Sequence, residues 1–572
     1  MPIATPLQAF LAYPIRTRLT LAILPLLLFA FLLRPFRSPP HSDLDATTAA
    51  ILNDATFQYP SDPHHAAITQ LRPKRVLIVG AGASGSAAAF FLRRAARVME
   101  ERIGVEEGRL VSDIVVIDKE GYVGGRDTTV YPRDDPRARP IELGASVFVE
   151  ANKNMNKAAK LFNLTVVQPD FGDTGLGIWN GTAFLYQTSL SHSIFSGWWD
   201  TLSAAYRYGP LSPIRTNSAV NALVKRFSML YNFKIMSERG AVRSVRAMAD
   251  HLGLGAEMTK RKADDWVLKG VGVGEKWMGE VMEGTTRNYG MDMSSIHALA
   301  AGVSMATSGA SSIEGGNWRV FEGMLKNASA TLVLGTTVTD ILPFTNEQGE
   351  GMFEVRTNTS ESAQAQPFDN VFFAAPWHLS PISKSMAHFF DEKIPHQKYT
   401  HLHVTLFTTT KARPDPVFFS LPPDTVLPGL ILTSSYLSRS GAAGLPPPRF
   451  HSIGWHGETY PGSGEYTVKI FSMTYLNDDF LADLAGERPS WVYRKEWDAY
   501  PRMTPVSHYA PVEPFKGFQY LAAMEPWISC METQTLSARE AVARVVEDWW
   551  GMGLGECRGG GMAWDWTCPN EL

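Results

Sequence analysis

Three closely spaced glycines, Gly80, Gly82 and Gly85, are the residues of this sequence with the clearest chemical use. They follow the Val- and Ile-rich run 75–79 and precede the Ala-rich segment 86–92, so the pattern G-x-G-x-x-G joins a predicted strand to a predicted helix. The first glycine permits a tight turn, the second lets backbone N–H groups approach a phosphate, and the third allows helix and strand to pack closely. Because a helix N-terminus also attracts anions, we expect a pyrophosphate to bind here. The predicted turn comprises Gly80, Gly82, Ala83, Ser84 and Gly85.

A carboxylate at the end of a second predicted strand extends this site. Residues 113–118 form a short apolar run that ends in Asp118, whose carboxylate can accept hydrogen bonds from a ribose hydroxyl. Asp118 lies farther from the glycines than the usual spacing of about 20 residues. The polar insert 98–110 accounts for the excess, either as a longer helix or as a loop. Lys119 follows directly and is counted with the site. The alternative is that Asp118 is only a solvated strand terminus.

A second glycine turn indicates which dinucleotide binds. Gly124, Gly125 and Arg126 follow the acidic strand, and a further strand-like segment, 141–146, comes after them. This order resembles the flavin-containing oxidoreductases of the amine oxidase and phytoene desaturase type. The resemblance implies FAD as the cofactor, with the arginine and its glycines near the pyrophosphate and the approach to the flavin ring. The alternative is an arginine in a surface turn. The segment contributes Gly144, Ala145 and Ser146.

The same resemblance implies cofactor contacts later in the chain. A strand-like segment, 331–338, is expected beside the adenine, and the predicted strands 369–376 and 518–525 return to the nucleotide. In such folds a Met-Glu pair opens the last helix, here predicted over 533–550, and the helix dipole stabilises negative charge on the reduced flavin. The loop 526–530 departs from the family pattern, as does the alanine that stands where a second glycine is common in the segment above. The residues implied here are Val338, Met531 and Glu532.

Three motifs in the middle of the chain make the resemblance more specific. Residues 286–290 read T-R-N-Y-G, a predicted helix that starts with His297 covers 297–304, and 313–317 read I-E-G-G-N. Their order and spacing are similar to those of the prenylcysteine oxidase (prenylcysteine lyase) family, and the resemblance covers about residues 75–538. It implies an FAD-dependent thioether oxidase. Such an enzyme cleaves farnesyl- or geranylgeranyl-L-cysteine to cysteine, a prenyl aldehyde and H2O2, with O2 as the acceptor.

The residues that carry out the reaction are less evident. His297 is the one catalytic candidate, but a lone histidine beside an apolar helix is more often structural. Hydride transfer to a flavin can also proceed without a protein base. An isoprenoid tunnel is expected among aromatic and Met-rich stretches at 198–199, 227–231, 277–278 and 418–419. Two alternatives stay open: a flavin amine oxidase acting on another apolar substrate, and a lumenal glycoprotein that keeps FAD without catalysis.

The expected fold class is α/β, with a discontinuous, Rossmann-like FAD domain of the amine oxidase type and an inserted α+β substrate domain. A helix is predicted over 220–231, where large apolar residues recur at helical spacing. The Pro-rich stretches 414–428 and 445–448 predict surface loops. The predicted ranges are 73–150, 320–378 and 512–552 for the FAD domain, 151–319 and 379–511 for the substrate domain, and 553–572 for a C-terminal tail.

The N-terminus carries an uncharged apolar run, 19–33, with arginines on both sides. Its length suits a signal peptide better than a full bilayer span of about 20 residues. An uncleaved signal-anchor stays open because no clean cleavage site follows. Residues 1–40 are therefore predicted to be a signal peptide or signal-anchor and 41–72 a linker. A signal-anchor would attach the protein to a membrane. We expect the secretory pathway, with the lysosome or vacuole as the destination.

Sequons and cysteines bear on the same question. Of the three cysteines, Cys557 and Cys568 could pair in an oxidising lumen, whereas Cys530 is expected to be free. An excess of N-x-S/T sequons favours a glycoprotein. The sequons begin at Asn163, Asn180, Asn327 and Asn358.

Composition excludes other classes of function. With 572 residues and a hydrophobic fraction of 45%, the chain can build two domains with full cores. Its net charge of −4 and the lack of a basic stripe argue against nucleic-acid binding. There is no internal repeat, and no Cys/His spacing typical of zinc, so no metal is expected. The expected partners are prenylcysteine, as a small-molecule substrate, and O2.

Overall fold

The computed structural model describes residues 68, 70–168, 175–188, 205–359, 366–439, 446–556 and 563–568. Residues 61–557 and 562–572 belong to one unit. The predicted signal segment 1–40, nearly all of the linker 41–72 and the Trp198–Trp199 pair lie outside the described residues.

The glycine-rich turn belongs to a five-stranded sheet in which every neighbouring pair of strands is parallel. The strand order is β18-β12-β1-β2-β9. Val76, Leu77 and Ile78 of β1 are all buried, as a central strand with both faces covered requires. The predicted α/β class is thus confirmed. The strands are β1 (Lys74–Val79), β2 (Val111–Ile117), β9 (Thr331–Val333), β12 (Asn370–Phe373) and β18 (Phe518–Tyr520).

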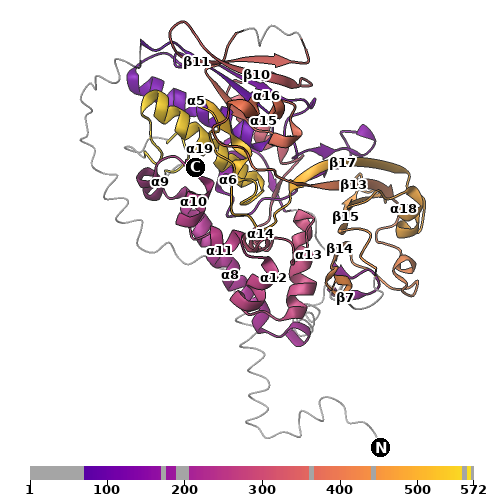
Figure 1. Ribbon diagram of the computed structural model, residues 1–572. Coiled ribbons are helices and arrows are strands. Elements are labelled where there is room, and N and C mark those ends of the chain that lie inside the picture. Colours follow the sequence, from indigo (N-terminus) through magenta and orange to yellow (C-terminus); the bar gives the residue numbers. More distant parts are fainter. Residues whose placement is uncertain are drawn as a thin grey trace, which may run out of the picture. The chain divides into compact units, whose positions relative to one another are not determined.

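Helix α5 packs on the strands of this sheet, and α15 and α19 both contact α5. α5 and α19 lie side by side (Figure 1). α5 starts at Ala83, within the glycine turn. It is followed by Gly104, whose left-handed backbone (φ 71°) lets its N–H donate to carbonyl oxygens of the last helical turn. The insert 98–110 therefore extends the helix to Ile103 and then forms a loop that leads to β2. The helices are α5 (Ala83–Ile103), α15 (Trp318–Asn327) and α19 (Met531–Trp550).

A second sheet has seven strands in the order β17-β13-β16-β15-β14-β6-β7. Its neighbours are antiparallel except for the parallel pair β14 and β6. The long strands β13 and β17 run beside each other (Figure 1). Helix α18 packs apolar residues such as Leu481 into its core. The elements are β6 (Leu176–Trp179), β7 (Phe184–Gln187), β13 (Tyr399–Thr409), β14 (Leu430–Thr433), β15 (Ser452–Glu458), β16 (Tyr466–Ser472), β17 (Trp491–Pro501) and α18 (Asp478–Ala485).

Helices dominate the chain between β7 and β8. The predicted helix 220–231 starts earlier than expected, because α8 spans Leu211–Phe227, and a 3-10 turn then covers Ser228–Tyr231. Two π-helical stretches, Trp266–Val271 and Trp277–Met282, follow. The α-helices of this region are α8, α9 (Phe233–Arg239), α10 (Val245–His251), α11 (Ala256–Thr259), α12 (Ala263–Asp265), α13 (Glu283–Thr286) and α14 (Ala298–Ser304).

Shorter elements connect these parts. Three further antiparallel strand pairs form, β3 with β4, β5 with β8, and β10 with β11. Their bounds, with the remaining α-helices, are β3 (Thr129–Val130), β4 (Ile141–Glu142), β5 (Val166–Val167), β8 (Ser312–Ile313), β10 (Val338–Thr345), β11 (Gly351–Thr357), α6 (Lys153–Leu161), α16 (Ser383–Met386) and α17 (Tyr436–Arg439). All strands of the five-stranded sheet lie in the ranges predicted for the FAD domain, and all strands of the seven-stranded sheet lie in those predicted for the substrate domain. The domain boundaries themselves stay a prediction.

Three local predictions are wrong. The strand predicted over 331–338 is divided, because β9 ends at Val333 and β10 begins only at Val338. The strand predicted over 518–525 ends at Tyr520, and Leu521–Met524 form a 3-10 turn, because the chain there must bend toward α19. The predicted surface loop 414–428 contains residues of the core: Phe419 is 1% exposed, and its ring packs on Trp179 with centroids 5.0 Å apart. The Phe418–Phe419 pair therefore belongs to the core of the second sheet rather than to a tunnel.

Other predictions concern membranes and cysteines. Across the part of the chain that the structure describes, no helix combines the length and the apolar character needed to cross a bilayer. Cys530 is free and Cys568 is disulfide-bonded, while Cys557 lies outside the described residues. Of the sequon asparagines, Asn180 is 5% exposed and its side chain accepts hydrogen bonds within its own turn.

The packing of α5 on β1 predicts the effect of adding one methyl group. A Cβ on Gly85 would stand 1.8 Å from the carbonyl oxygen of Gly80. We expect Gly85→Ala to lower the free energy of unfolding by about 1–3 kcal/mol or more. Gly351→Ala is the matched control, because no atom lies within 4 Å of its added Cβ. Urea unfolding of both variants tests this, and equal stabilities would contradict it.

Candidate cofactor site

Two glycine turns meet at the N-terminus of α5. The Gly124 N–H donates to the carbonyl oxygen of Ala81 (3.0 Å), and Gly82 forms an isolated parallel bridge with Gly124. A Cβ on Gly124 would stand 2.1 Å from the carbonyl oxygen of Asp127, and its φ of 112° also favours glycine. No side chain caps the first turn of α5, and no acidic residue lies in it. Such a helix start suits a bound phosphate.

Asp118 stands at the end of β2 and touches the first turn. Its Oδ2 accepts a hydrogen bond from the Ala81 N–H (2.7 Å), and its Oδ1 accepts one from the Glu120 N–H (2.8 Å). Burial raises the pKa of this carboxyl group. Each oxygen keeps a further lone pair, so the carboxylate can still accept from a ribose hydroxyl. The predicted acidic residue and the predicted phosphate turn are therefore in direct contact.

The neighbours of Asp118 differ in their placement. Thr336 donates its N–H to the Asp118 carbonyl oxygen (2.9 Å), which sets the start of β10 beside the acidic strand end. Val338 opens β10 there and is 4% exposed. The Lys119 side chain is 71% exposed and pairs with Glu120 (3.8 Å). The structure thus brings Val338 to the site but leaves the Lys119 side chain in solvent.

Arg126 connects the second turn to the seven-stranded sheet. Its guanidinium forms an ion pair with Glu525 and donates to the carbonyl oxygen of Ala499 in β17 (3.3 Å). Tyr399 in β13 donates to the other oxygen of Glu525 (2.6 Å). Glu525 is 1% exposed, so it depends on both partners to compensate for its burial. This network fixes Arg126 beside the glycine turns, although its side chain is still 34% exposed.

The segment after β4 runs along the same turn. A Cβ on Gly144 would stand 2.6 Å from the carbonyl oxygen of Arg126. Lys469 of β16 donates from Nζ to Ser146 Oγ (3.1 Å) and to the Glu142 carbonyl oxygen (2.9 Å). Burial lowers the pKa of Lys469 to about 8. A buried ammonium group is thus held against the predicted flavin-side segment.

The I-E-G-G-N motif holds this segment from the other side. Asn317, fully buried, donates from its side chain to the Ala145 carbonyl oxygen (2.8 Å) and from its backbone N–H to Glu142 Oε1 (2.7 Å). Its Oδ1 accepts from the Ile313 N–H (2.9 Å). The motif therefore positions the cofactor segment by hydrogen bonds.

Two buried carboxyl groups, Asp127 and Glu142, lie next to the segment. Burial raises the pKa of Glu142 to about 7. Burial and the nearby Glu142 raise the pKa of Asp127 well above its usual range. Among the described residues neither oxygen of Asp127 has a donor. These raised pKa values favour a neutral carboxyl group at this pair.

The Met-Glu pair opens α19 as the resemblance implies, but the Glu532 carboxylate faces another helix. It accepts the N–H groups of Asn154 (2.8 Å) and Met155 (3.0 Å) at the start of α6, together with the hydroxyl of Tyr231. Burial raises its pKa. Its side chain thus joins α6 and α19, so Glu532 can face a cofactor only with its backbone, while Met531 packs in a core cluster.

His297 has a structural position. Its Nδ1 accepts the Ala300 N–H (3.1 Å) and caps α14, while Nε2 lies 3.1 Å from the Pro526 carbonyl oxygen. The residue is fully buried, and burial lowers the pKa of the imidazole to about 4. Because both ring nitrogens are engaged in the neutral form, we assign His297 no part in the chemistry.

The T-R-N-Y-G motif is also satisfied internally. Arg287 pairs with Glu283 (3.2 Å) and Asp292 (2.6 Å), and Arg439 pairs with the same two carboxylates. Tyr289 donates its hydroxyl to the Ser529 carbonyl oxygen (3.1 Å). These contacts hold α13 against the loop after β14 and against the chain that leads into α19.

Sequence reasoning missed Glu525, Tyr399, Lys469 and Asp127. Glu525 and Tyr399 lie far from Arg126 in the chain and belong to no recognisable motif. Asp127, which directly follows Gly-Gly-Arg, carried a local signal: a carboxyl group beside a glycine turn. Lys469 is a single charge within the apolar strand β16, a pattern that can indicate a buried functional group.

Comparison with known families decides the assignment. The family model described as prenylcysteine lyase matches residues 191–554. This chain belongs to the prenylcysteine lyase family. A model of the NAD(P)-binding Rossmann-like domain matches residues 78–163, which contain both glycine turns.

Similar proteins agree with this family membership. The farnesylcysteine lyase of Arabidopsis thaliana is 27% identical over 486 residues, covering 83% of this chain and 88% of that protein. Human prenylcysteine oxidase 1 is 27% identical over 492 residues, covering 83% of this chain and 90% of that protein. A solved structure of an engineered putrescine oxidase gives a TM-score of 0.50 at 14% identity, covering 83% of this chain and 99% of that one. The last likeness shows the fold alone.

FAD is the cofactor that this prenylcysteine lyase family member binds, as predicted. The residues fit it: the uncapped start of α5 suits the pyrophosphate, Asp118 the ribose, and the backbone of Gly124, Gly125 and Gly144 leaves room that side chains would fill. Of the predicted contact residues, the structure gathers the glycine turns, Asp118, Arg126, Gly144–Ser146 and Val338.

The carboxyl pair predicts a pH dependence of stability. Because the folded-state pKa of Glu142, about 7, lies above its ordinary value of 4.5, its stabilising contribution is present at low pH and is lost as pH rises through 7. We expect wild-type protein to lose on the order of 1–3 kcal/mol from this group between pH 5 and pH 8, and Glu142→Gln to lose less.

Urea unfolding at both pH values measures the difference. Glu347→Gln, at an exposed hairpin position, is the control and should follow the wild type. A Glu142→Gln variant with the same pH dependence as the wild type would show that the carboxyl pair is not protonated in the folded state.

Proposed function

We propose that this chain is an FAD-dependent oxidase that cleaves the thioether of farnesyl- or geranylgeranyl-cysteine. The products would be free cysteine, a prenyl aldehyde and H2O2, released during the breakdown of prenylated proteins. The observation that carries the proposal is the prenylcysteine lyase match over 191–554. The same chain also forms the candidate FAD site at the glycine turns. The printed names of two relatives give the substrate class, farnesylcysteine and prenylcysteine.

The reacting atom is the carbon between sulfur and the first isoprenoid double bond. Loss of a hydride from this carbon leaves a cation that both the sulfur and the alkene stabilise. Water then adds, and the hemithioacetal breaks into the aldehyde and the cysteine thiol. Bound FAD would supply the hydride acceptor, and O2 would take up the two electrons and two protons to give H2O2. The first step needs no protein base, in keeping with the engaged nitrogens of His297.

Buried positive charge supports the reduction. Lys469, with a pKa of about 8, carries its charge at neutral and acidic pH, and it lies against Ser146. Arg126, whose carbonyl oxygen lies next to Gly144, is held by its ion pair with Glu525. Fixed positive groups favour the negative charge that develops when a flavin accepts a hydride, because they need no reorganisation at that moment.

We further propose that the protein works in the secretory pathway, in the lysosome or vacuole, as a glycoprotein. The apolar run 19–33 would act as a signal peptide or as an anchor to the membrane. Asn163 and Asn358 are exposed and can accept a glycan, whereas Asn180 is buried. The disulfide at Cys568 suits an oxidising lumen.

Product analysis tests the proposed reaction. Purified full-length protein is mixed with S-farnesylcysteine in air, and peroxide, free thiol and aldehyde are measured together. We expect the three products in equal amounts. S-dodecylcysteine is the matched control, since it keeps the thioether and an apolar chain but has no double bond to stabilise the cation, and we expect no turnover.

Other outcomes would redirect the assignment. Turnover of putrescine or another amine without cleavage of S-farnesylcysteine would favour an amine oxidase. A flavin that no thioether or amine bleaches under anaerobic conditions would favour a non-catalytic flavoprotein. Either result would contradict the proposal while leaving the family membership intact.

A further inference from the structure

Two histidines and two carboxylates gather on one face of the strand pair β13 and β17. His401 lies opposite Asp498 in the antiparallel register, and His403 lies opposite Glu496. Because strand residues two apart share a face, all four side chains project from the same side of the sheet. The intervening Leu402 faces the other way and packs in a core cluster with Ala499. The four polar residues thus form a compact group on a rigid scaffold.

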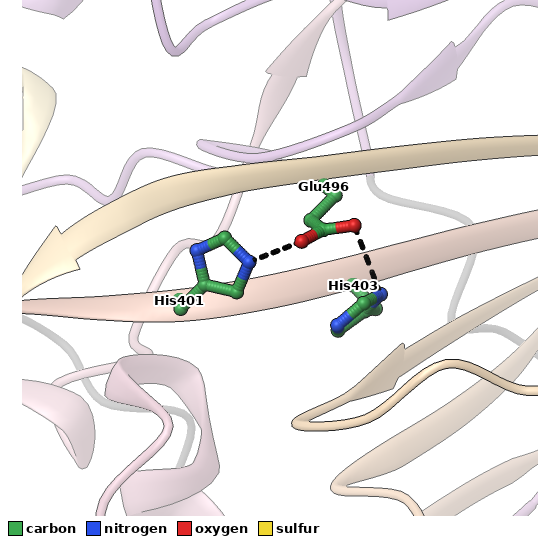
Figure 2. Close-up of side chains that lie close together, drawn as sticks. All are labelled: His401, His403 and Glu496. Carbon is green, nitrogen blue, oxygen red and sulfur yellow. Dashed lines mark hydrogen bonds and ion pairs between the residues drawn. The ribbon is translucent and has the colours of Figure 1, made fainter.

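The donor atoms are close enough to share one ion. His401 Nε2 lies 2.6 Å from Glu496 Oε1, and His403 Nδ1 lies 4.0 Å from Glu496 Oε2. Figure 2 shows Glu496 between the two imidazole rings. One ligand atom from each of the three residues falls within 4.8 Å of the others. No other group of three such residues meets this condition in the described part of the chain.

Asp498 provides a second and separate indication. Its Oδ1 lies 3.2 Å from Nδ1 of His401, the nitrogen on the far side of the ring from Glu496. A carboxylate that accepts the Nδ1–H of a histidine fixes the tautomer in which Nε2 carries a lone pair. Nε2 then faces the Glu496 carboxylate at 2.6 Å, a contact that either a proton on Nε2 or a bound metal ion satisfies. Metal-binding histidines show this carboxylate contact as a rule.

We propose that His401, His403 and Glu496 bind one divalent transition-metal ion, Zn²⁺ by preference, with Asp498 orienting His401. Two imidazoles and one carboxylate are a donor set that zinc accepts, and water would complete a tetrahedral sphere. Calcium and magnesium are disfavoured because they bind through oxygen ligands. The proposal is independent of the oxidase activity and goes against the sequence-based expectation that no metal binds.

The geometry needs only small movements to accept the ion. Bonds of about 2.0–2.1 Å in a tetrahedral zinc site place the ligand atoms about 3.3 Å apart. The separations here, up to 4.8 Å, bracket that value. His401 and Glu496 are 51% and 60% exposed, so side-chain rotation brings their donor atoms into place while the strands stay fixed. The exposure also gives the ion a path from solvent.

A metal bound here would tie together two strands that also hold Arg126. Tyr399 lies two positions before His401 in β13 and donates to Glu525, the partner of Arg126. Ala499 follows Asp498 in β17 and accepts from Arg126 itself. The ion would cross-link β13 to β17 next to these contacts, so we expect zinc to stabilise the folded state.

Metal titration of the FAD-loaded, full-length protein, without a histidine tag, tests the proposal. Chelator-treated protein is titrated with Zn²⁺ by calorimetry, and with Co²⁺ while its visible d–d absorption is recorded. We expect saturation at one ion per chain and a higher Tm with zinc. His401→Gln, His403→Gln and Glu496→Gln should abolish the Co²⁺ spectrum. Asp498→Asn, which alters only the orienting contact, should weaken zinc binding about tenfold or more.

His508→Gln is the matched control, because it removes an exposed histidine outside the group. It should bind zinc as the wild type does, and unchanged FAD content in all variants shows that they are folded. Two outcomes would overturn the proposal. One is zinc binding of His403→Gln that equals the wild type. The other is no saturable binding by the wild type, which would identify the group as a protonated histidine between two carboxylates.

Discussion

The contact between two glycine turns is the constraint on which the rest of the structure depends. Gly82 and Gly124 form a backbone bridge, and a Cβ on Gly124 would collide with the carbonyl oxygen of Asp127. At the same time a Cβ on Gly85 would collide with Gly80, so α5 can reach its place on β1 only without side chains there. Parts of the chain that are separate in sequence must therefore meet through bare backbone. The space so formed is what a pyrophosphate needs.

Charged residues around this contact are arranged so that each buried charge has a partner. Arg126 and Tyr399 both bind Glu525, and Lys469 donates to Ser146 and to the carbonyl of Glu142. Asp127 and Glu142 differ from these residues, because burial raises the pKa of both carboxyl groups. The second sheet supplies Tyr399, Lys469 and Ala499 to these contacts, so the sheet that would carry the substrate region also fixes the cofactor side. The same residues therefore pack the two sheets together and position the cofactor site.

Features that depend on residues adjacent in the chain could be predicted from the sequence. The turn at Gly80–Gly85 and the acidic end at Asp118 follow from short motifs, because backbone geometry there depends on adjacent residues. Glu525 could not be found, since its role depends on a contact with Arg126 that only the fold creates. The strand predicted after Phe518 was too long, because apolar residues continue through Leu521–Met524 although the chain turns there. The His401–Glu496 group likewise depends on a strand register that no local pattern reveals.

The most direct test of the account compares FAD affinity in two neighbouring variants. Asp118 touches the phosphate turn, whereas the adjacent Lys119 side chain lies in solvent. The dissociation constant of FAD is measured by flavin fluorescence on apoprotein of Asp118→Ala and Lys119→Ala. The account predicts at least about tenfold weaker binding for Asp118→Ala, as expected when hydrogen bonds to a charged group are lost, and wild-type affinity for Lys119→Ala. Equal FAD affinities in the two variants would contradict the claim that Asp118 and the glycine turns bind FAD.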